Sequence, residues 1–134
     1  MLQNSVTKGK KCWSNKMYAN WDINFYCNGT PFTPLELDIV KCEVHLWHDC
    51  STWALKKPTN SQLNFKDWNT VSYLFSSYVY IDVKHKCNLT GGHDKVCKVW
   101  PGDECLSCNN YEESKCTFNI ELNKTSSENA CHSF

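Results

Sequence analysis

The chain has 134 residues, with 14 basic and 14 acidic side chains, so its formal net charge at pH 7 is zero. Every basic residue is lysine, and ten residues are cysteine. A neutral chain without arginine lacks both a positive surface for phosphates and the bidentate group that grips base edges, which argues against nucleic-acid binding. No apolar run reaches the roughly 18 to 20 residues that a membrane span needs. We therefore expect one domain without a membrane span.

The first eleven residues differ from the rest of the chain. Segment 1–11 is polar and lysine-rich and ends at the first cysteine, which predicts a flexible N-terminal arm before a single disulfide-stapled domain over 12–134. This segment lacks the charged and apolar regions of a secretory signal. We interpret Met1 as a translation start placed on a mature domain.

Apolar and polar residues alternate in several segments. Alternation over 21–27, followed by turn residues at 28–31, predicts a strand and a turn. Alternation over 35–46 changes phase at Ile39 and Val40, which predicts one strand with a bulge there. A second turn is expected at 58–61.

The second half of the chain mixes strands with loops. The longest β-rich run, 71–83, predicts the central strand, and 117–122 predicts a last strand. Between them lie five cysteines and several turn residues, which predict loops cross-linked by disulfides. Helical periodicity is poor throughout. The predicted fold class is therefore mostly β: a disulfide-rich antiparallel β-sandwich or small β-barrel with a loop-rich C-terminal half.

The cysteine content indicates an oxidising compartment, where an even number of cysteines can pair completely. Three glycosylation sequons, which begin at Asn28, Asn88 and Asn123, agree with this interpretation. The sequence therefore predicts a secreted, extracellular glycoprotein. All ten cysteines are predicted to form disulfides: Cys12, Cys27, Cys42, Cys50, Cys87, Cys97, Cys105, Cys108, Cys116 and Cys131.

The crowding of five cysteines between Cys87 and Cys116 has two interpretations. Four of them, near His85 and His93, have spacings that could coordinate zinc: Cys97, Cys105, Cys108 and Cys116. The other six cysteines need partners in the same chain, so we favour disulfides that staple this region locally, with no metal and no cofactor.

One histidine-rich segment could carry catalysis. His45, His48 and Asp49 lie close together in sequence, and a histidine beside an aspartate can activate water. The flanking motifs of secreted phospholipases and acid ribonucleases are absent, as are a nucleophile elbow and a glycine-rich phosphate loop. We expect no catalytic residue and place both histidines at a strand end near a disulfide. A small secreted hydrolase that uses these three residues is the alternative.

Aromatic residues are abundant, with six each of tryptophan, tyrosine and phenylalanine. An aromatic body with a polar tip suits a ligand pocket or a protein interface. The residues predicted to bind ligand are Trp47, Trp53, Trp68, Tyr73, Tyr78, Tyr80 and Trp100.

One segment is patterned like a known family. Tyr80–Cys87, followed after nine residues by Cys97–Trp100, resembles the late strands of tick salivary lipocalins. This resemblance, over 80–100, implies a β-barrel with a small-ligand cavity and a secreted protein that sequesters histamine, serotonin, leukotrienes or complement components. The strands that hold the family's amine-binding carboxylates do not align. The acidic residues on predicted strands are expected to face solvent: Glu36, Asp38, Glu43 and Asp82.

These observations predict a secreted binding protein that sequesters a host protein or a small amphipathic molecule, in host–parasite interaction and immune modulation. The host protein would be a cytokine, a receptor or a complement component. The ectodomain of a receptor or of a viral envelope glycoprotein would share the same cysteines, sequons and aromatic residues, and is a second alternative.

Overall fold

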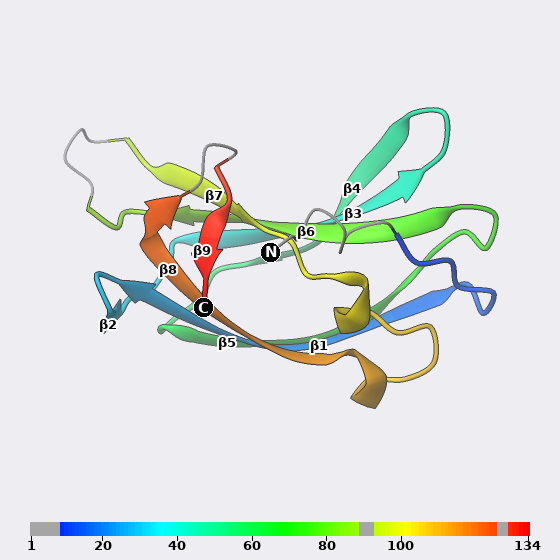
Figure 1. Cartoon of the computed structure of the whole chain (residues 1–134), viewed down its shortest axis with the longest axis horizontal. Coiled ribbons are helices and arrows are strands. Elements are labelled where there is room, and N and C mark those ends of the chain that lie inside the picture. The colour runs from blue at the N-terminus through cyan, green and yellow to red at the C-terminus, as the bar shows by residue number, and fades with distance from the viewer. Residues whose placement is uncertain (1–8, 89–92, 126–128) are drawn as a thin grey trace.

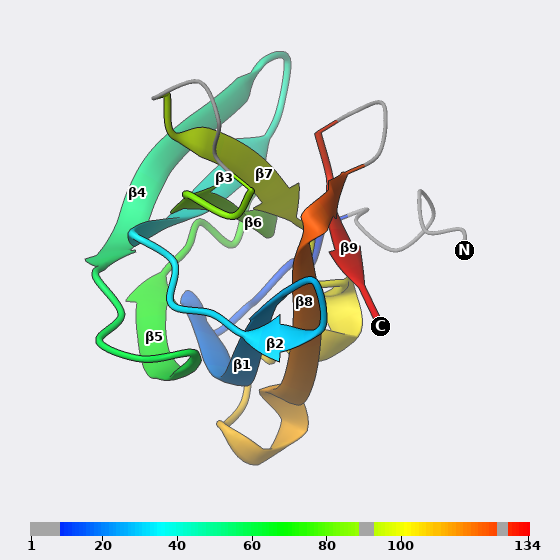
Figure 2. The ribbon, with the colours of Figure 1, turned by 90° about the vertical axis from the view of Figure 1, so that its left-hand side faces the viewer.

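The computed structural model describes residues 9–88, 93–125 and 129–134, apart from the side chains of His48 and Thr125. Two β-sheets face each other as separate layers (Figures 1 and 2). In the first sheet, β1 pairs antiparallel with β5 and parallel with β8, while β2 extends the end of β1 and β9 pairs with β8. The strands of this sheet are β1 (Lys16–Cys27), β2 (Thr30–Pro31), β5 (Gln62–Thr70), β8 (Lys115–Thr125) and β9 (Cys131–Ser133).

The second sheet is antiparallel throughout, in the order β4, β3, β6, β7. Its strands are β3 (Glu36–Val44), β4 (His48–Lys56), β6 (Ser76–His85) and β7 (Lys95–Val99). Two short 3-10 turns, η2 (Asp103–Cys105) and η3 (Glu112–Ser114), precede β8. The sheets do not close into a barrel, so the prediction of a disulfide-rich β-sandwich is confirmed. Within the described ranges, no helix has the length and apolar composition needed to cross a bilayer.

Large apolar side chains fill the space between the sheets. Trp21 of β1 is fully buried, and its ring lies 5.4 Å from that of Phe65 on β5. The indole Nε1 of Trp21 donates a hydrogen bond to the carbonyl oxygen of Cys105 at 2.8 Å, so its polar group is satisfied inside the core. Ile39 and Ile81, which are directly paired on β3 and β6, close the core from the other sheet.

The observed strand boundaries differ from the predicted ones where tertiary contacts intervene. The predicted strand over 71–83 begins only at Ser76, because residues 71–75 cross from one sheet to the other. Val71 donates its backbone N–H to the carbonyl of Asn15 at 3.0 Å, which holds the start of this connection against the first sheet. The predicted strands over 21–27 and 117–122 extend further, as β1 and β8.

The predicted bulge at Ile39 and Val40 is confirmed, with its extra residue on the neighbouring strand. Ile39 pairs with Ala54 and Val40 with Thr52, which leaves Trp53 of β4 without a partner on β3. The pairing of β3 with β6 runs without a shift. On both sides of the bulge, the side chains of β3 therefore alternate between the same inner and outer faces of the sheet. The sequence had indicated that these faces exchange at the bulge.

All ten cysteines form disulfides, as predicted. The expectation that disulfides form locally within the region 87–116 is wrong. One disulfide joins two cysteines of this region, and three others link the region to distant segments of the chain. The members of the alternative zinc cluster are divided among three of these bonds. The five bonds are Cys12–Cys108, Cys27–Cys87, Cys42–Cys50, Cys97–Cys131 and Cys105–Cys116.

Most of the predicted N-terminal arm, residues 1–8, lies outside the described residues. The remainder contacts the sandwich: Lys10 forms an antiparallel bridge with Ser77, and the backbone N–H of Gly9 donates to Oδ1 of Asp103 at 3.3 Å.

Candidate functional site

The seven aromatic residues predicted to bind ligand lie in four separate places. Trp47 and Tyr73 lie in loops at one end of the sandwich, and Trp53 lies between the sheets. Tyr78, Tyr80 and Trp100 lie together beside the second sheet, while Trp68 is on the outer face of the first sheet. The tertiary structure therefore does not bring the predicted residues into one site.

The three places outside the loops have internal partners for their aromatic groups. At Trp68, the Nζ of Lys16 lies 4.9 Å from the ring centre. Trp53 donates from Nε1 to Oδ2 of Asp67 at 3.1 Å, which joins the two sheets. Beside the second sheet, the Nζ of Lys98 lies 4.1 Å from the Tyr80 ring centre and 2.7 Å from Oδ1 of Asp82. Burial, followed by the neighbouring Tyr80, raises the pKa of Tyr78 above its ordinary value, although Lys98 partly opposes this effect.

Aromatic rings from three loops form two neighbouring groups at one end of the sandwich. The ring of Trp13, before β1, lies 6.2 Å from that of Tyr73, in the β5–β6 connection. In the same connection, the Phe75 ring lies 4.8 Å from the imidazole of His45, which is 5.1 Å from the Trp47 ring. We call this surface the loop-end patch: Trp13, His45, Leu46, Trp47, Tyr73, Leu74 and Phe75.

The loop-end patch is exposed and lies beside two disulfides. Trp13 is 74% exposed, Leu46 92% and Trp47 65%. Cys12–Cys108 fixes the residue before Trp13, and Cys42–Cys50 links β3 to β4 two residue pairs before the loop that joins them. Trp13 was not among the residues predicted to bind ligand, although its position directly after a cysteine was a signal that it lies in a fixed turn.

Beneath the patch, the space between the sheets becomes polar. Because β3 and β6 stay in register, Lys41 and Glu43 share the inner face with their partners Val79 and Ser77. The Nζ of Lys41 donates to the carbonyl oxygen of Thr70 at 2.5 Å, and Glu43 accepts the backbone N–H of Ser72 at 3.2 Å. The expectation that Glu43 faces solvent is therefore wrong, because its carboxylate points toward the β5–β6 connection.

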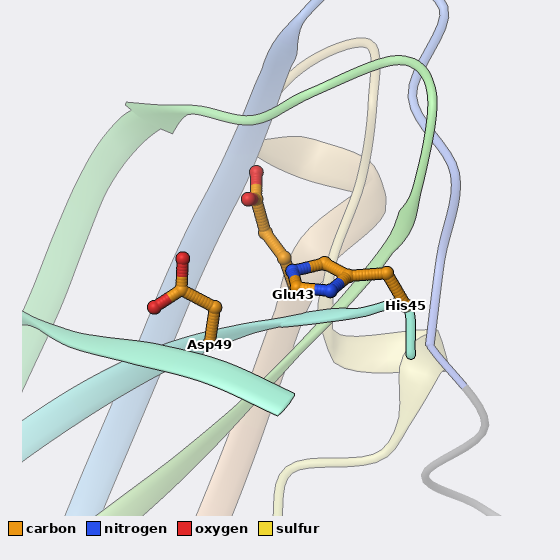
Figure 3. Close-up of side chains that lie close together, drawn as sticks. All are labelled: Glu43, His45 and Asp49. Atoms are coloured by element: carbon orange, nitrogen blue, oxygen red, sulfur yellow. The ribbon is translucent and has the colours of Figure 1, made fainter. Parts of the chain in front are cut away.

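Glu43, His45 and Asp49 meet at this polar end of the sandwich (Figure 3). Glu43 and Asp49 are directly opposed on β3 and β4, and Figure 3 shows the imidazole of His45 pointing back toward them. One oxygen or nitrogen from each side chain lies within 4.8 Å of the others. The structure thus brings together His45 and Asp49 of the alternative hydrolase site and adds Glu43. The side chain of His48 lies outside the described residues.

The three sequon asparagines, distant in sequence, meet at the opposite end of the sandwich. Asn28 donates from Nδ2 to Oδ1 of Asn88 at 3.0 Å, and Asn88 donates to Oδ1 of Asn123. Asn28 follows the end of β1 and Trp13 precedes its start. The twelve residues of β1 span about 40 Å at roughly 3.3 Å per residue, so the sequons and the loop-end patch are at opposite ends.

Glu121 of β8 organises the turns around these asparagines. Its carboxylate accepts backbone N–H groups from Asn28 at 3.0 Å, Gly29 at 2.7 Å and Asn123 at 2.8 Å. Burial alone would raise the pKa of Glu121, but these donors outweigh burial and lower the pKa below its ordinary value. The ionised carboxylate therefore stabilises the sequon end.

The outer face of the first sheet carries a polar groove of about 550 Å³. Asn64 donates from Nδ2 to Oδ1 of Asp22 at 2.9 Å, so part of its hydrogen-bonding capacity is used within the groove. None of the residues predicted to bind ligand lines this groove. The groove is lined by Asp22, Ile23, Asn24, Asn60, Gln62, Leu63, Asn64 and Thr117.

Two facing sheets and five disulfides define the chain as a disulfide-rich β-sandwich protein, and such disulfide content is typical of extracellular proteins. Comparisons with protein-family models, with curated proteins and with solved structures each found no match. The residues that resemble tick lipocalins form β6 and β7, where Ile81 pairs with Val99. That resemblance stays an interpretation of the sequence.

Proposed function

We propose that this chain is a secreted, non-catalytic binding protein that recognises an extracellular protein through the loop-end patch. The observation that carries the proposal is the gathering of two ring groups, Trp13 with Tyr73 and Phe75 with His45 and Trp47, from three loops at one end of the sandwich. Single exposed apolar residues are ordinary on protein surfaces, whereas a contiguous aromatic surface supports a partner that covers it.

The exposed tryptophans of the patch favour tight recognition. Burying a large apolar side chain contributes about 1.5–3 kcal/mol, and Trp13 and Trp47 leave most of their surface available for an interface. Tryptophan and tyrosine are also the residues that most often dominate binding energy in interfaces. The patch therefore has the composition of an interface centre.

Disulfides beside the patch lower the entropic cost of binding. Cys12–Cys108 and Cys42–Cys50 restrict two of the three loops before any partner arrives. A loop that is already ordered loses less conformational freedom on association. The function we infer is capture of an extracellular protein such as a cytokine, a receptor or a complement component.

The packed core supports a protein partner rather than a small amphipathic ligand held between the sheets. Trp21, Phe25 and Phe65 occupy the space between the layers and are almost completely buried. A small-molecule site of the enclosed kind needs an apolar cavity of several hundred Å³. A surface patch of aromatic residues suits the flatter surface of another protein.

The test is capture from extracellular fluid, followed by affinity measurement with the purified captured protein. The wild-type chain is compared with the double variant Trp47→Ala/Tyr73→Ala. The matched control, Trp68→Ala/Trp100→Ala, removes two partly exposed tryptophans outside the loop-end patch. We expect the patch variant to lose at least about tenfold in affinity, as interface anchors do, and the control to keep wild-type affinity.

Equal loss of affinity in both double variants, or no loss in the patch variant, would contradict the proposal. Circular dichroism of each variant shows that the β fold is retained. Capture that depends on the control residues instead would move the binding surface to the outer faces of the sheets.

A further inference from the structure

Glu43, His45 and Asp49 form a ligand set that suits a transition-metal cation. Two carboxylates and one imidazole supply hard oxygen ligands together with a nitrogen ligand, a combination that Zn²⁺ binds well and that Ca²⁺ and Mg²⁺ use rarely. The three ligand atoms already lie within 4.8 Å of one another. Metal–ligand distances of about 2.0–2.2 Å require the ligand atoms to move closer together than this on binding, and Asp49 is the exposed member of the set.

The negative charge of this cluster has no cationic partner within the described part of the chain. Glu43 and Asp49 are directly opposed on adjacent strands, and like charges in this position destabilise a sheet. Lys41, which lies two residues before Glu43 on the same face of β3, donates instead to Thr70 and to Asn69 on β5. The ion pairs among the described residues are Lys84–Glu36 and Lys98–Asp82, which lie elsewhere.

A second, independent observation points to a ligand at the same place. Ser77 is fully buried, and its hydroxyl has no hydrogen-bond partner among the described residues. Ser77 is the direct β6 partner of Glu43 and shares its inner face. An unsatisfied buried hydroxyl costs free energy, and a cation with its bound water would supply the missing partner.

The imidazole of His45 is held in place by ring packing. It contacts the rings of Trp47 and Phe75, and within the described ranges neither of its nitrogens donates or accepts a hydrogen bond. A ring that packing holds in place, with a nitrogen near two carboxylates, is preorganised to bind a cation.

We propose that Glu43, His45 and Asp49 bind one divalent transition-metal cation, represented here by Zn²⁺, at the polar end of the sandwich. The cation would join the end of β3 to the start of β4. It would also restrain the β5–β6 connection through the Glu43–Ser72 bond and the contact between His45 and Phe75. The loop-end patch would then be more rigid with the cation bound.

The test uses chelator-treated protein and Zn²⁺ as the probe, with calorimetry for stoichiometry and affinity. We expect one Zn²⁺ per chain and a loss of affinity of at least about tenfold in each of Glu43→Gln, His45→Gln and Asp49→Asn. His132→Gln, which changes an exposed histidine on β9, is the matched control and should keep wild-type affinity. His48→Gln should also keep it.

Nuclear magnetic resonance distinguishes direct ligation from a merely structural role of His45, because only direct ligation shifts the imidazole nitrogen signals of His45. Unchanged affinity in all three ligand variants would overturn the proposal, as would loss of binding in His48→Gln with retention in His45→Gln. Circular dichroism verifies the fold of each variant. Partner capture in the presence of chelator tests the proposed function separately, so that either proposal can fail alone.

Discussion

At the scale of single residues, His85 is the clearest case of a polar group held in the core. It is fully buried at the end of β6, and its Nδ1 accepts the backbone N–H of Cys87 at 3.1 Å. The Nε2 has no partner among the described residues, and in the neutral ring this nitrogen carries the proton. Burial, together with the nearby charge of Lys95, lowers the pKa of His85 below its ordinary value of 6.5.

This lowered pKa predicts that acid destabilises the protein through His85. Between the lowered folded-state pKa and about 6.5, the unfolded chain binds more protons than the folded chain, so the free energy of unfolding falls as pH decreases through this window. In His85→Asn, whose amide oxygen can replace Nδ1 as acceptor, this pH dependence should disappear. Urea denaturation at several pH values measures both slopes. Equal slopes in the variant and the wild type would show that His85 is not the titrating group.

At the scale of structural elements, the three sequon asparagines lie close together, and this arrangement affects glycosylation. Cys27 directly precedes Asn28, and Cys87 directly precedes Asn88. The Cys27–Cys87 disulfide therefore holds these two asparagines together. Their side-chain amides, and that of Asn123 on β8, form one hydrogen-bonded group. An N-glycan is attached through the same amide nitrogen that makes these bonds.

We expect that folded protein secreted from glycosylating cells carries fewer than three N-glycans per chain. Three glycans on neighbouring amides would separate the turns that Glu121 and the Cys27–Cys87 disulfide hold together. Intact-mass measurement of the secreted protein, before and after enzymatic glycan removal, counts the occupied sequons. A fully disulfide-bonded form with all three sequons occupied would contradict this expectation.

At the scale of the whole molecule, the disulfides differ most in the length of chain that they close. Cys12–Cys108 spans 96 residues and joins the turn before β1 to the loops before β8, whereas Cys42–Cys50 spans 8 residues within one hairpin. Closing a longer loop removes more conformational entropy from the unfolded chain. The long-range bond therefore carries more of the stability of the fold.

Removing each disulfide by paired alanine substitution should show this difference. Cys12→Ala/Cys108→Ala should lower the free energy of unfolding by about 5 kcal/mol, and Cys42→Ala/Cys50→Ala by about 2 to 3 kcal/mol. Urea denaturation at neutral pH measures both values. A larger loss for the hairpin disulfide would mean that native-state contacts, rather than loop closure, dominate its contribution.

The sequence predicted those parts of the fold in which the local pattern is complete. The alternation around Trp21 and Phe25 predicted β1, and the phase change at Ile39 predicted a bulge. β5 was missed because Asp67 and Asn69 interrupt the apolar face of that strand. They share the inner face of the strand with Phe65, where Trp53 and Lys41 of the other sheet form hydrogen bonds with them. The partners that make these polar positions favourable are distant in sequence.

Strand alternation and residue composition are local properties, and they were enough to predict the β class, the complete pairing of the cysteines and the surplus of aromatic side chains. Three features emerged only from the folded structure: which cysteines pair, the inward position of Glu43 beside Asp49 and His45, and the shared surface of Trp13, Tyr73 and Trp47. These features depend on strand register and on loops that are far apart along the chain, and no local pattern encodes the path that brings them together.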